Sequence, residues 1–372
     1  MLNSINILDL SRVLAGPLAT MMLGDLGANV IKVEKPGTGD DTRGWGPPFD
    51  DRGESAYYLS VNRNKKSIAL DLDQHRDRGA LLEIAAGADV VVDNFKPGTL
   101  ERRGIDPRKF LAANPRLIWC TITGFGEESA RPGYDLVVQA ESGWMAITGE
   151  PDGEPMRVGV ALADIIAGKD AAIAILAALV ARGLSASPNS VDERRIHVSL
   201  AASATAALIN VAQNSLVTGK DAKRWGNQHP NLVPYQLFHA SDRAMIIAVG
   251  TDAQWKSFAS AAGLSALRDD ASLANNAGRL ASRDRVVAAV SEKLRERSAA
   301  EWMTVLDAGG VPCGIVKTVL ESLAEASASP LTGIAPSVPG TVRIPPPRLD
   351  EHGSDIRLRG WAAFRHDGQL GR

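Results

Sequence analysis

The stretch Ile5-Asn-Ile-Leu-Asp-Leu10 is followed by Pro17-Leu-Ala-Thr-Met-Met-Leu-Gly-Asp-Leu-Gly27 and then by Asn29-Val-Ile-Lys-Val-Glu34. The first and third segments are short and rich in Ile, Val and Leu, which predicts strands, and the middle segment predicts a helix that ends at its glycine. A strand, a helix and a second strand in this order indicate parallel strands joined by a crossover helix. This unit decides the fold class of the first part of the chain.

The same alternation continues toward residue 200. Further strand patterns lie at residues 67–72, 89–93, 117–123 and 196–200, and helix patterns lie at 76–86 and 165–182. These patterns predict an α/β fold with a doubly wound, Rossmann-like sheet. Ligands bind such sheets at the carboxyl ends of the strands, which here lead into the loops 11–16, 34–44, 94–98 and 124–135.

The pattern changes after residue 200. The sequence predicts a helix over 201–217, a hairpin from residues 235–238 and 245–249, and helices over 252–262 and 283–297. Residues 327–347 are rich in Pro, Gly and Ser and indicate an extended connection. A smaller α+β region is therefore expected to follow the α/β region.

The composition excludes several classes of protein. Hydrophobic residues make up 45% of the chain and charged residues 23%, with a net charge of −2, which gives no electrostatic footprint for nucleic acid or a membrane surface. Two cysteines exclude a disulfide framework and fit a reducing cytosol. The N-terminus has no basic segment of a signal peptide, and the apolar run at 171–181 is too short to span a bilayer. A cytoplasmic protein is expected.

Common cofactor and metal motifs are missing from the sequence. The first helix is not opened by Gly-x-Gly-x-x-Gly, and there is neither a P-loop nor a Gly-x-Ser-x-Gly elbow. The six histidines and two cysteines do not have metal-ligand spacing. We therefore predict no metal site and no dinucleotide site.

Asp164 is the only charged residue between Arg157 and Lys169, in the run Val158-Gly-Val-Ala-Leu-Ala-Asp-Ile-Ile-Ala-Gly168. A carboxylate in apolar surroundings must be paired, hydrogen-bonded or functional. Because Asp164 precedes a strong helix pattern, it could be an N-cap, and on this segment alone that interpretation is favoured. It could also be a nucleophile or a base.

Several loops resemble the class III CoA-transferases, the CaiB-BaiF type family that includes formyl-CoA and carnitine CoA-transferases. The resemblance begins with Arg12-Val-Leu-Ala-Gly-Pro-Leu-Ala-Thr-Met-Met-Leu-Gly-Asp-Leu-Gly and continues to Asp40. It goes on, in order, through Asn64-Lys-Lys-Ser, Ala88-Asp-Val-Val-Val-Asp-Asn-Phe-Lys-Pro-Gly, Gly133-Tyr-Asp-Leu-Val-Val-Gln-Ala, the Asp164 segment, Gly226-Asn-Gln-His-Pro-Asn and Gly309-Gly-Val-Pro-Cys-Gly. Seven motifs in order cover nearly the whole chain.

The resemblance implies a domain layout and an assembly. A large Rossmann-like CoA-binding domain is expected from residues 1–200, completed by 330–372, with a linker helix at 201–225 and a small α+β domain at 226–325. Members of the family form homodimers of two interlinked, ring-shaped chains, and the Pro-rich return at 327–347 is similar to the crossing that closes the ring.

The resemblance also implies a reaction. The residue that matches Asp164 attacks an acyl-CoA thioester to form a mixed anhydride, which CoA thiolate converts into an aspartyl-CoA thioester before a carboxylic acid takes the CoA. Coenzyme A would then be part of the substrate, with no tightly bound cofactor. Because Asp164 must be ionised to attack, we expect the N-terminus of its helix to favour the anion.

Site residues are carried over from the family residue by residue. The positions that match CoA contacts are Leu14, Ala15, Lys35, Leu70, Asn94, Phe95 and Arg102. The positions expected near the acyl group or the acid are Tyr134, Asp135, Gln139, Gly226, Asn227 and His229. Each has a plainer alternative: Lys35 as a solvated cation, Phe95 as a core residue, Arg102 as a surface residue and His229 as a cap of its own loop.

Departures from the family patterns shape the choice between activities. Leu14 stands where some formyl-CoA transferases have Gln, and Gly226-Asn-Gln-His229 replaces their tetraglycine flap. The related α-methylacyl-CoA racemases need a His where this chain has Tyr134, and a phenol is a poorer proton carrier at neutral pH. A CoA-transferase is therefore preferred over a racemase, and over a non-catalytic CoA-binding protein because Asp164 is intact.

Overall fold

The computed structural model describes residues 1–185 and 189–366. The chain divides into two compact units. The first consists of Met1–Met145, Arg157–Lys220 and the segment that begins at Ala326, and the second consists of Ala146–Met156 and Asp221–Glu325. Each unit is described by itself below.

The first unit is built on a six-stranded parallel sheet in the order β3-β2-β1-β4-β5-β6. The strands are β1 (Asn6–Asp9), β2 (Asn29–Glu34), β3 (Lys65–Ala69), β4 (Val90–Asp93), β5 (Ile118–Thr123) and β6 (Arg195–Ser199). This order reverses direction beside β1, as in the doubly wound nucleotide-binding sheets. The predicted mixed α/β fold with a parallel sheet is thus confirmed.

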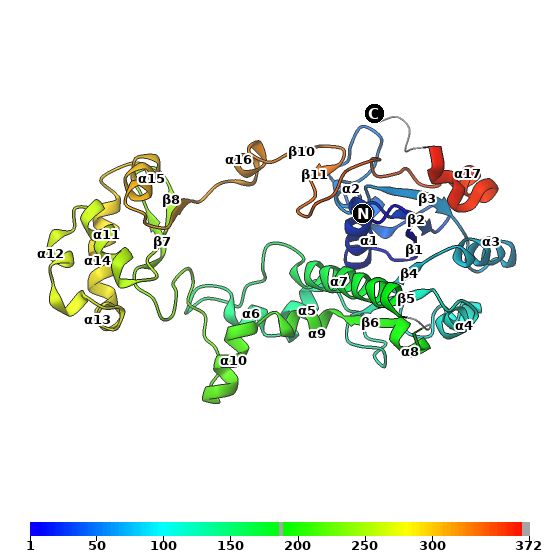
Figure 1. The fold of residues 1–372 in the computed structure, drawn as a ribbon. Coiled ribbons are helices and arrows are strands. Elements are labelled where there is room, and N and C mark those ends of the chain that lie inside the picture. The colour runs from blue at the N-terminus through cyan, green and yellow to red at the C-terminus, as the bar shows by residue number, and fades with distance from the viewer. Residues whose placement is uncertain (186–188, 367–372) are drawn as a thin grey trace. The chain divides into compact units, whose positions relative to one another are not determined.

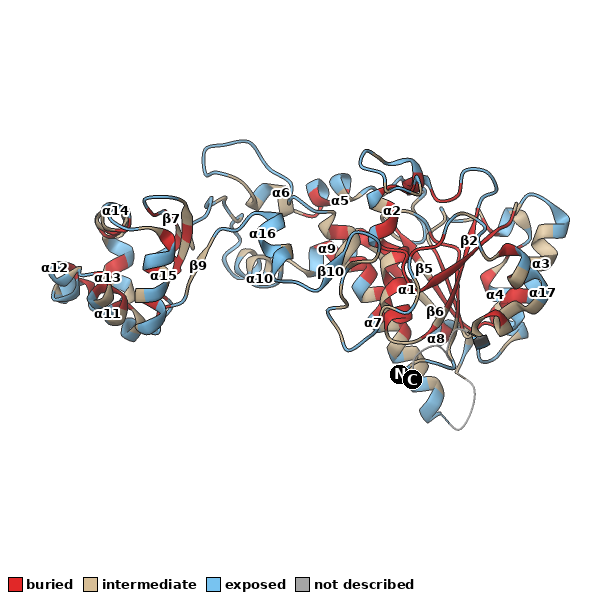
Figure 2. Ribbon diagram, turned by 90° about the horizontal axis from the view of Figure 1, so that it is seen from above, coloured by how far each residue is buried: buried red, intermediate tan, exposed pale blue. Residues whose placement is uncertain are grey.

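Helices cover both faces of this sheet, so its strands are apolar on both sides (Figure 2). One face, with Ile7, Val90 and Val92, packs on α1 (Ala15–Asp25) and α7 (Leu162–Leu184). The other face, with Leu8 and Val91, packs on α3 (His75–Ala86), α4 (Pro107–Ala113) and α17 (Gly353–Arg359).

Shorter elements complete the first unit (Figure 1). They are η1 (Asp41–Gly44), α2 (Ala56–Ser60), η2 (Glu101–Arg103), α5 (Asp135–Glu141), α8 (Val191–Arg194), α9 (Leu200–Ala206), α10 (Ile209–Thr218), the short pair β10 (Ala328–Ser329) and β11 (Gly333–Ile334), and η4 (Gly360–His366). Helix α6 (Trp144–Ile147) spans the boundary between the units.

The single helix predicted over 201–217 is wrong. The structure has two helices there, α9 and α10, which meet at 73°. Leu208 donates its N–H to the carbonyl of Thr205, three residues back, which tightens the last turn of α9. Ile209 then takes a positive φ of 43°, which a regular right-handed helix does not allow.

The second unit has a three-stranded antiparallel sheet, β7 (Tyr235–His239), β8 (Ala244–Ala248) and β9 (Cys313–Ile315). The predicted hairpin is confirmed as β7 and β8. Its helices are α11 (Asp252–Ala261), α12 (Ser265–Arg268), η3 (Ala271–Leu273), α13 (Asn276–Ala281), α14 (Arg283–Leu294), α15 (Ala299–Ala308) and α16 (Val319–Ala324). Trp255, Phe258 and Trp302 are fully buried at its centre.

Within the described residues, no single helix has the length and apolar character needed to cross a membrane. The bent pair α9 and α10 together reach the required length and apolar composition, and only those two criteria were met.

Candidate functional site

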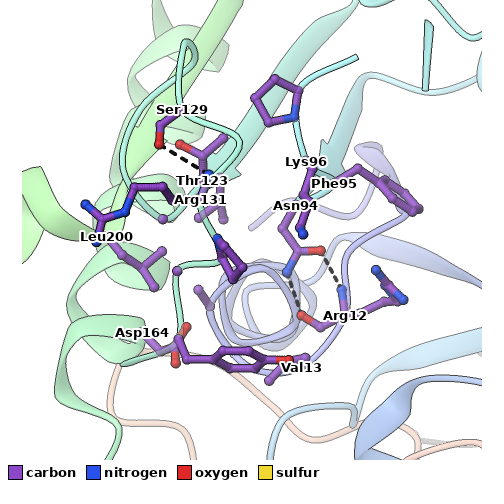
Figure 3. Close-up of a pocket in the computed structure, with 17 residues that line it drawn as sticks. Arg12, Val13, Asn94, Phe95, Lys96, Thr123, Ser129, Arg131, Asp164 and Leu200 are labelled. Carbon is purple, nitrogen blue, oxygen red and sulfur yellow. Dashed lines mark hydrogen bonds between the residues drawn. The ribbon is translucent and has the colours of Figure 1, made fainter. Parts of the chain in front are cut away.

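Two neighbouring cavities lie where the strands β1, β2, β4 and β5 end. The first, of about 300 Å³, is lined by Asp164 and by loops that carry Arg12, Asn94 and Tyr134, and we name it the Asp164 cavity (Figure 3). The second, of about 310 Å³, is lined by Lys35, Leu70 and Arg103, and we name it the Lys35 cavity. Arg12 and Phe95 line both, so the cavities share a wall.

The shared wall is held by a reciprocal pair of hydrogen bonds. Arg12 donates its backbone N–H to Asn94 Oδ1 at 2.9 Å, and Asn94 Nδ2 donates to the Arg12 carbonyl at 2.6 Å (Figure 3). The guanidinium of Arg12 lies 5.3 Å from the centre of the Phe95 ring. The loops after β1 and β4 are thereby joined, and Asn94 and Phe95 both lie at the predicted site.

Asp164 occupies the first turn of α7, and the alternative that it is the N-cap of this helix is wrong. The helix starts at Leu162, the N-cap residue is Ala161, and Ala161 makes no side-chain cap bond. Asp135 from α5 supplies the cap instead, since its Oδ1 accepts the N–H of Ala163 at 2.8 Å. The Asp164 carboxyl is therefore free to face the cavity.

The electrostatics of Asp164 also differ from expectation. Burial and the nearby negative charge of Asp135 raise the pKa of Asp164 to about 7. A hydrogen bond from the backbone N–H of Ala15, at the start of α1, opposes this rise. The expectation that the start of Asp164's own helix favours the anion is wrong, because the lowering N–H belongs to α1 and is outweighed by loss of water and by Asp135.

Helices α1 and α7 approach closely at Gly168, one turn after Asp164. A Cβ at position 168 would lie 2.6 Å from the Ala15 carbonyl oxygen, closer than any real contact. Glycine therefore allows the first turn of α7 to reach the first turn of α1. This approach brings Asp164 to the N–H of Ala15.

Asp135 and Gln139 together fix the segment that leads into α7. Gln139 is fully buried, and its Oε1 accepts the N–H of Val158 at 2.9 Å. Its Nε2 donates to Asp135 Oδ2 at 2.7 Å and to the Val160 carbonyl at 3.2 Å. The two predicted residues thus meet, and their bonds hold the chain just before Asp164.

The other predicted CoA contacts divide among the cavities. Ala15 lines the Asp164 cavity, exposed Lys35 and buried Leu70 line the Lys35 cavity, and Leu14 lines a third cavity with Tyr57, Asp135 and Ile165. Arg102 lines neither of the first two cavities and donates to Thr99 Oγ1 at 3.2 Å.

Sequence reasoning did not single out Arg12, Tyr57 or Arg103. Arg103 lines the Lys35 cavity and pairs with Asp73 at 2.8 Å, while the adjacent Arg102 does not line it. The rotation of the short helix η2 about its axis decides which of the two arginines faces the cavity, and sequence spacing does not reveal that rotation. Arg12 lies in the loop after the first strand, and this position was the signal by which the sequence could have identified it as a site residue.

The structure separates three further predicted residues, Tyr134 in the first unit and Asn227 and His229 in the second. Tyr134 lines the Asp164 cavity and is 62% exposed. Asn227 is exposed in the second unit. His229 Nδ1 accepts the N–H of Asn231 at 3.0 Å, and its ring centre lies 5.0 Å from that of Tyr235. His229 therefore caps its own loop, as the plainer alternative expected.

Gly226 begins that same loop of the second unit. It has a φ of +56° and donates its N–H to the Gly149 carbonyl at 3.1 Å. The positive φ suits glycine at this position. Within the described residues, no group of three or more His, Cys, Asp and Glu side chains is placed to hold a metal ion.

The model of CoA-transferase family III matches residues 2–349 of this sequence. The chain belongs to CoA-transferase family III. It is 42% identical over 328 residues to a succinyl-CoA:glutarate CoA-transferase of Mus musculus, covering 87% of this chain and 74% of that protein. It is 39% identical over 332 residues to a succinate–glutarate CoA-transferase of Agrobacterium fabrum, covering 87% and 82%.

The fold agrees with that of a solved family member. The crystal structure of a CaiB/BaiF family protein from Brucella suis matches with a TM-score of 0.85 and 37% identity, over 96% of this chain and 98% of that one. The family expected from the seven motifs and the CoA-transferase class of enzyme are thereby confirmed.

The raised pKa of Asp164 predicts a pH-dependent stability. Folding favours the protonated carboxyl, so this contribution is fully present below the unfolded pKa near 3.8 and is lost as the pH rises through 7. Asp164→Asn cannot ionise, so its melting temperature should exceed that of the wild type by a margin that widens across this range and is constant above it. Each unit of pKa difference corresponds to about 1.4 kcal/mol, an upper bound for a partly solvated group.

Thermal unfolding of both proteins between about pH 5 and 8 measures this margin. Asp170→Asn removes a carboxyl elsewhere in α7 and is the matched control. A margin that does not change with pH would show that Asp164 titrates alike in the folded and unfolded chains.

Proposed function

We propose that this protein moves CoA from an acyl-CoA to a free carboxylic acid through an aspartyl-CoA thioester on Asp164. The observation that carries the proposal is a partly buried carboxyl with a pKa of about 7 that lines a cavity at the ends of the sheet strands. A carboxylate of raised basicity is a stronger nucleophile, and it is still substantially ionised at neutral pH.

The proposed cycle has four transfers. An Asp164 oxygen attacks the thioester carbon, the carbon–sulfur bond breaks, and CoA leaves as a thiolate. The thiolate attacks Cγ of Asp164 in the resulting anhydride and expels the donor acid. The acceptor carboxylate then attacks the aspartyl-CoA carbonyl and expels the thiolate again, and the thiolate attacks the acceptor carbonyl and frees Asp164.

The N–H of Ala15 supports this cycle. It faces the same cavity as the Asp164 carboxyl and already lowers the pKa of that carboxyl, so it can stabilise the negative charge that develops on an oxygen during attack at Cγ. Asp135 is not a second nucleophile in this proposal, because both its oxygens are engaged by Ala163 and Gln139.

We propose that CoA runs across the shared wall. In the Lys35 cavity, exposed Lys35 is the better cation for the phosphates because Arg103 shares its charge with Asp73, and Leu70 offers an apolar surface to adenine. The pantetheine arm would pass Phe95 and Asn94 to the Asp164 cavity. Gly226, Asn227 and His229, which the family resemblance places near the acyl group, lie in the second unit.

Dicarboxylic acids are the favoured substrates. The two relatives described above are named for succinate or succinyl-CoA together with glutarate. Arg12, Lys96 and Arg131 line the Asp164 cavity and offer positive charge to a second carboxylate. Arg131 shares its charge with Glu141 and Arg12 shares its charge with Asp41 at 3.4 Å, so Lys96 is the better candidate.

The homodimer of interlinked rings is also proposed for this chain. Helix α10 has no buried residue, and its side chains Ile209, Leu216 and Val217 are 73%, 78% and 75% exposed. Ile173 and Val180 of α7 are 64% and 60% exposed. Groups of exposed large apolar side chains mark interaction surfaces, and a second copy would cover these.

Trapping tests the covalent step. After incubation with succinyl-CoA, hydroxylamine should convert the Asp164 side chain to a hydroxamate, found by mass spectrometry of the peptide. Asp164→Ala should lose the adduct and at least about a thousandfold in turnover, as removal of a nucleophile does. Asp170→Ala, from the same helix, should keep both. Active enzyme with unmodified Asp164 would sink the proposal, and deuterium exchange at the acyl α-carbon without CoA transfer would favour a racemase.

Competition among acids tests the substrate class. With succinyl-CoA as donor, glutarate should be converted with a higher kcat/KM than butyrate, by about tenfold or more for one charge-assisted bond. Lys96→Met should reduce this preference while leaving butyrate nearly unaffected. Equal use of the two acids would reject the dicarboxylate assignment.

The mass in solution tests the dimer. The protein should have twice the chain mass of 39.4 kDa by light scattering. Leu216→Glu on α10 should yield monomer, whereas Leu358→Glu on α17, where the wild-type side chain is 84% exposed, should not. A wild-type monomer at micromolar concentration would contradict the proposal.

A further inference from the structure

The loop between β1 and α1 contains a strained residue. Val13 has a φ of +70°, a conformation that β-branched residues rarely adopt. Such strain persists only where surrounding contacts enforce it. The loop leads directly into Ala15; Val13 and Ala15 line the same cavity as Asp164, and the Ala15 N–H lowers the pKa of Asp164.

A buried ion pair enforces this conformation. The Asp40 carboxylate accepts the N–H of Val13 at 3.2 and 3.3 Å through its two oxygens. Lys32 Nζ lies 2.9 Å from Asp40 Oδ2 and donates to the Ser11 carbonyl at 2.9 Å. The side chains of Lys32 and Asp40 are both fully buried.

The remaining contacts of the loop come from the ends of neighbouring strands. Asp9 accepts the N–H of Ser11 at 2.9 Å, and Asn94 bonds both backbone groups of Arg12. Val13 is thus the one strained residue in the loop, and Asp40 is the group that accepts its N–H. Thr42 donates its N–H and its hydroxyl to Asp40 Oδ1, which fixes the carboxylate from the far side.

The start of α1 depends on this loop for its direction. The N-cap residue Leu14 has no side-chain cap bond, and an apolar side chain cannot supply one. The direction of the Ala15 N–H therefore follows from the backbone of residues 11–14. A shift at Val13 would turn that N–H away from Asp164.

We propose that Lys32 and Asp40 are positioning residues that lock Val13 in its left-handed conformation and so aim the Ala15 N–H at Asp164. The proposal rests on the proposed role of Asp164 as nucleophile. Lys32 lines neither cavity, and Asp40 stands in the wall of the Lys35 cavity with its carboxylate fully buried against Lys32 and Val13. Because the Lys32–Asp40 ion pair is buried, it holds Val13 more rigidly than an exposed pair would.

Several charged and titratable groups face Asp164, and a test of its pH dependence must take them into account. Asp135 faces it from α5 and Tyr57 from α2. Tyr134, Arg131, Lys96 and Arg12 line the same cavity from the loops. From α1 the contact is the Ala15 N–H, which lowers the pKa of Asp164.

Asp40→Asn separates positioning from through-space electrostatics, because the two predict opposite signs. Removal of a negative charge would by itself lower the pKa of Asp164 and move the acid limb of kcat/KM to lower pH. Loss of the aimed N–H would raise that pKa and move the limb up. We expect an upward shift of about one pH unit and a loss of roughly ten- to a hundredfold in kcat/KM.

Two further variants make the result specific. Val13→Gly, in the Asp40→Asn background, should move the acid limb back toward the wild type, because glycine adopts the left-handed conformation without strain. Asp25→Asn breaks another buried ion pair, with Arg63 at 2.7 Å, at the far end of α1, and should lower the melting temperature while leaving the acid limb in place.

Hydrogen exchange of the peptide 10–18 gives a readout that does not depend on catalysis. Exchange should be faster in Asp40→Asn and slower again after Val13→Gly, even if Asp164 proves not to be the nucleophile. If Asp40→Asn does not fold, Lys32→Met with Asp40→Asn removes both buried charges and replaces it in all measurements. An acid limb that stays in place or moves down, or equal exchange at 10–18, would overturn the proposal, as would an equal shift in Asp25→Asn.

Discussion

The close approach of α7 to α1 at Gly168 is the contact on which the site depends. It brings the first turns of two helices together, so that a carboxyl from one meets a backbone N–H from the other. Asp135 and Gln139 hold α7 on one side of this contact, and the 11–14 loop holds α1 on the other.

Charge is distributed unevenly around this contact. The supporting loop is fixed by carboxylates that have cationic partners, as Asp40 has Lys32. Asp164 has none at that distance, and its nearest charged neighbour, Asp135, is of the same sign. Carboxylates such as Asp40 are thus neutralised by partners, whereas Asp164, the proposed nucleophile, has no such partner and is destabilised as an anion. Burial also raises the pKa of Asp93, whose oxygens accept hydrogen bonds from Trp119, Thr121 and the N–H of Phe95.

Local sequence patterns predicted most of the framework. Short runs such as 89–93 and 117–123 are β-branched and bounded by turns, so strands and their parallel order followed. Asp164 was visible as a lone charge in an apolar run. Three features were beyond sequence reasoning, because each depends on contacts between distant segments: the cap that Asp135 gives to α7, the phase that turns Arg103 and not Arg102 to the cavity, and the positive φ of Val13. The bend between α9 and α10 was likewise not predicted from the sequence.

The raised basicity of Asp164 has a consequence for the direction in which a mixed anhydride would open. Thiolate can attack either carbonyl of an anhydride, and the less basic carboxylate leaves more readily. A substrate acid of ordinary acidity is then a better leaving group than Asp164 with its pKa of about 7. In the proposed mechanism, opening at the protein's own carbonyl would be favoured, so CoA would pass to the enzyme and the first acid would leave before the second arrives. The burial that costs the protein stability would thereby give the proposed reaction an order.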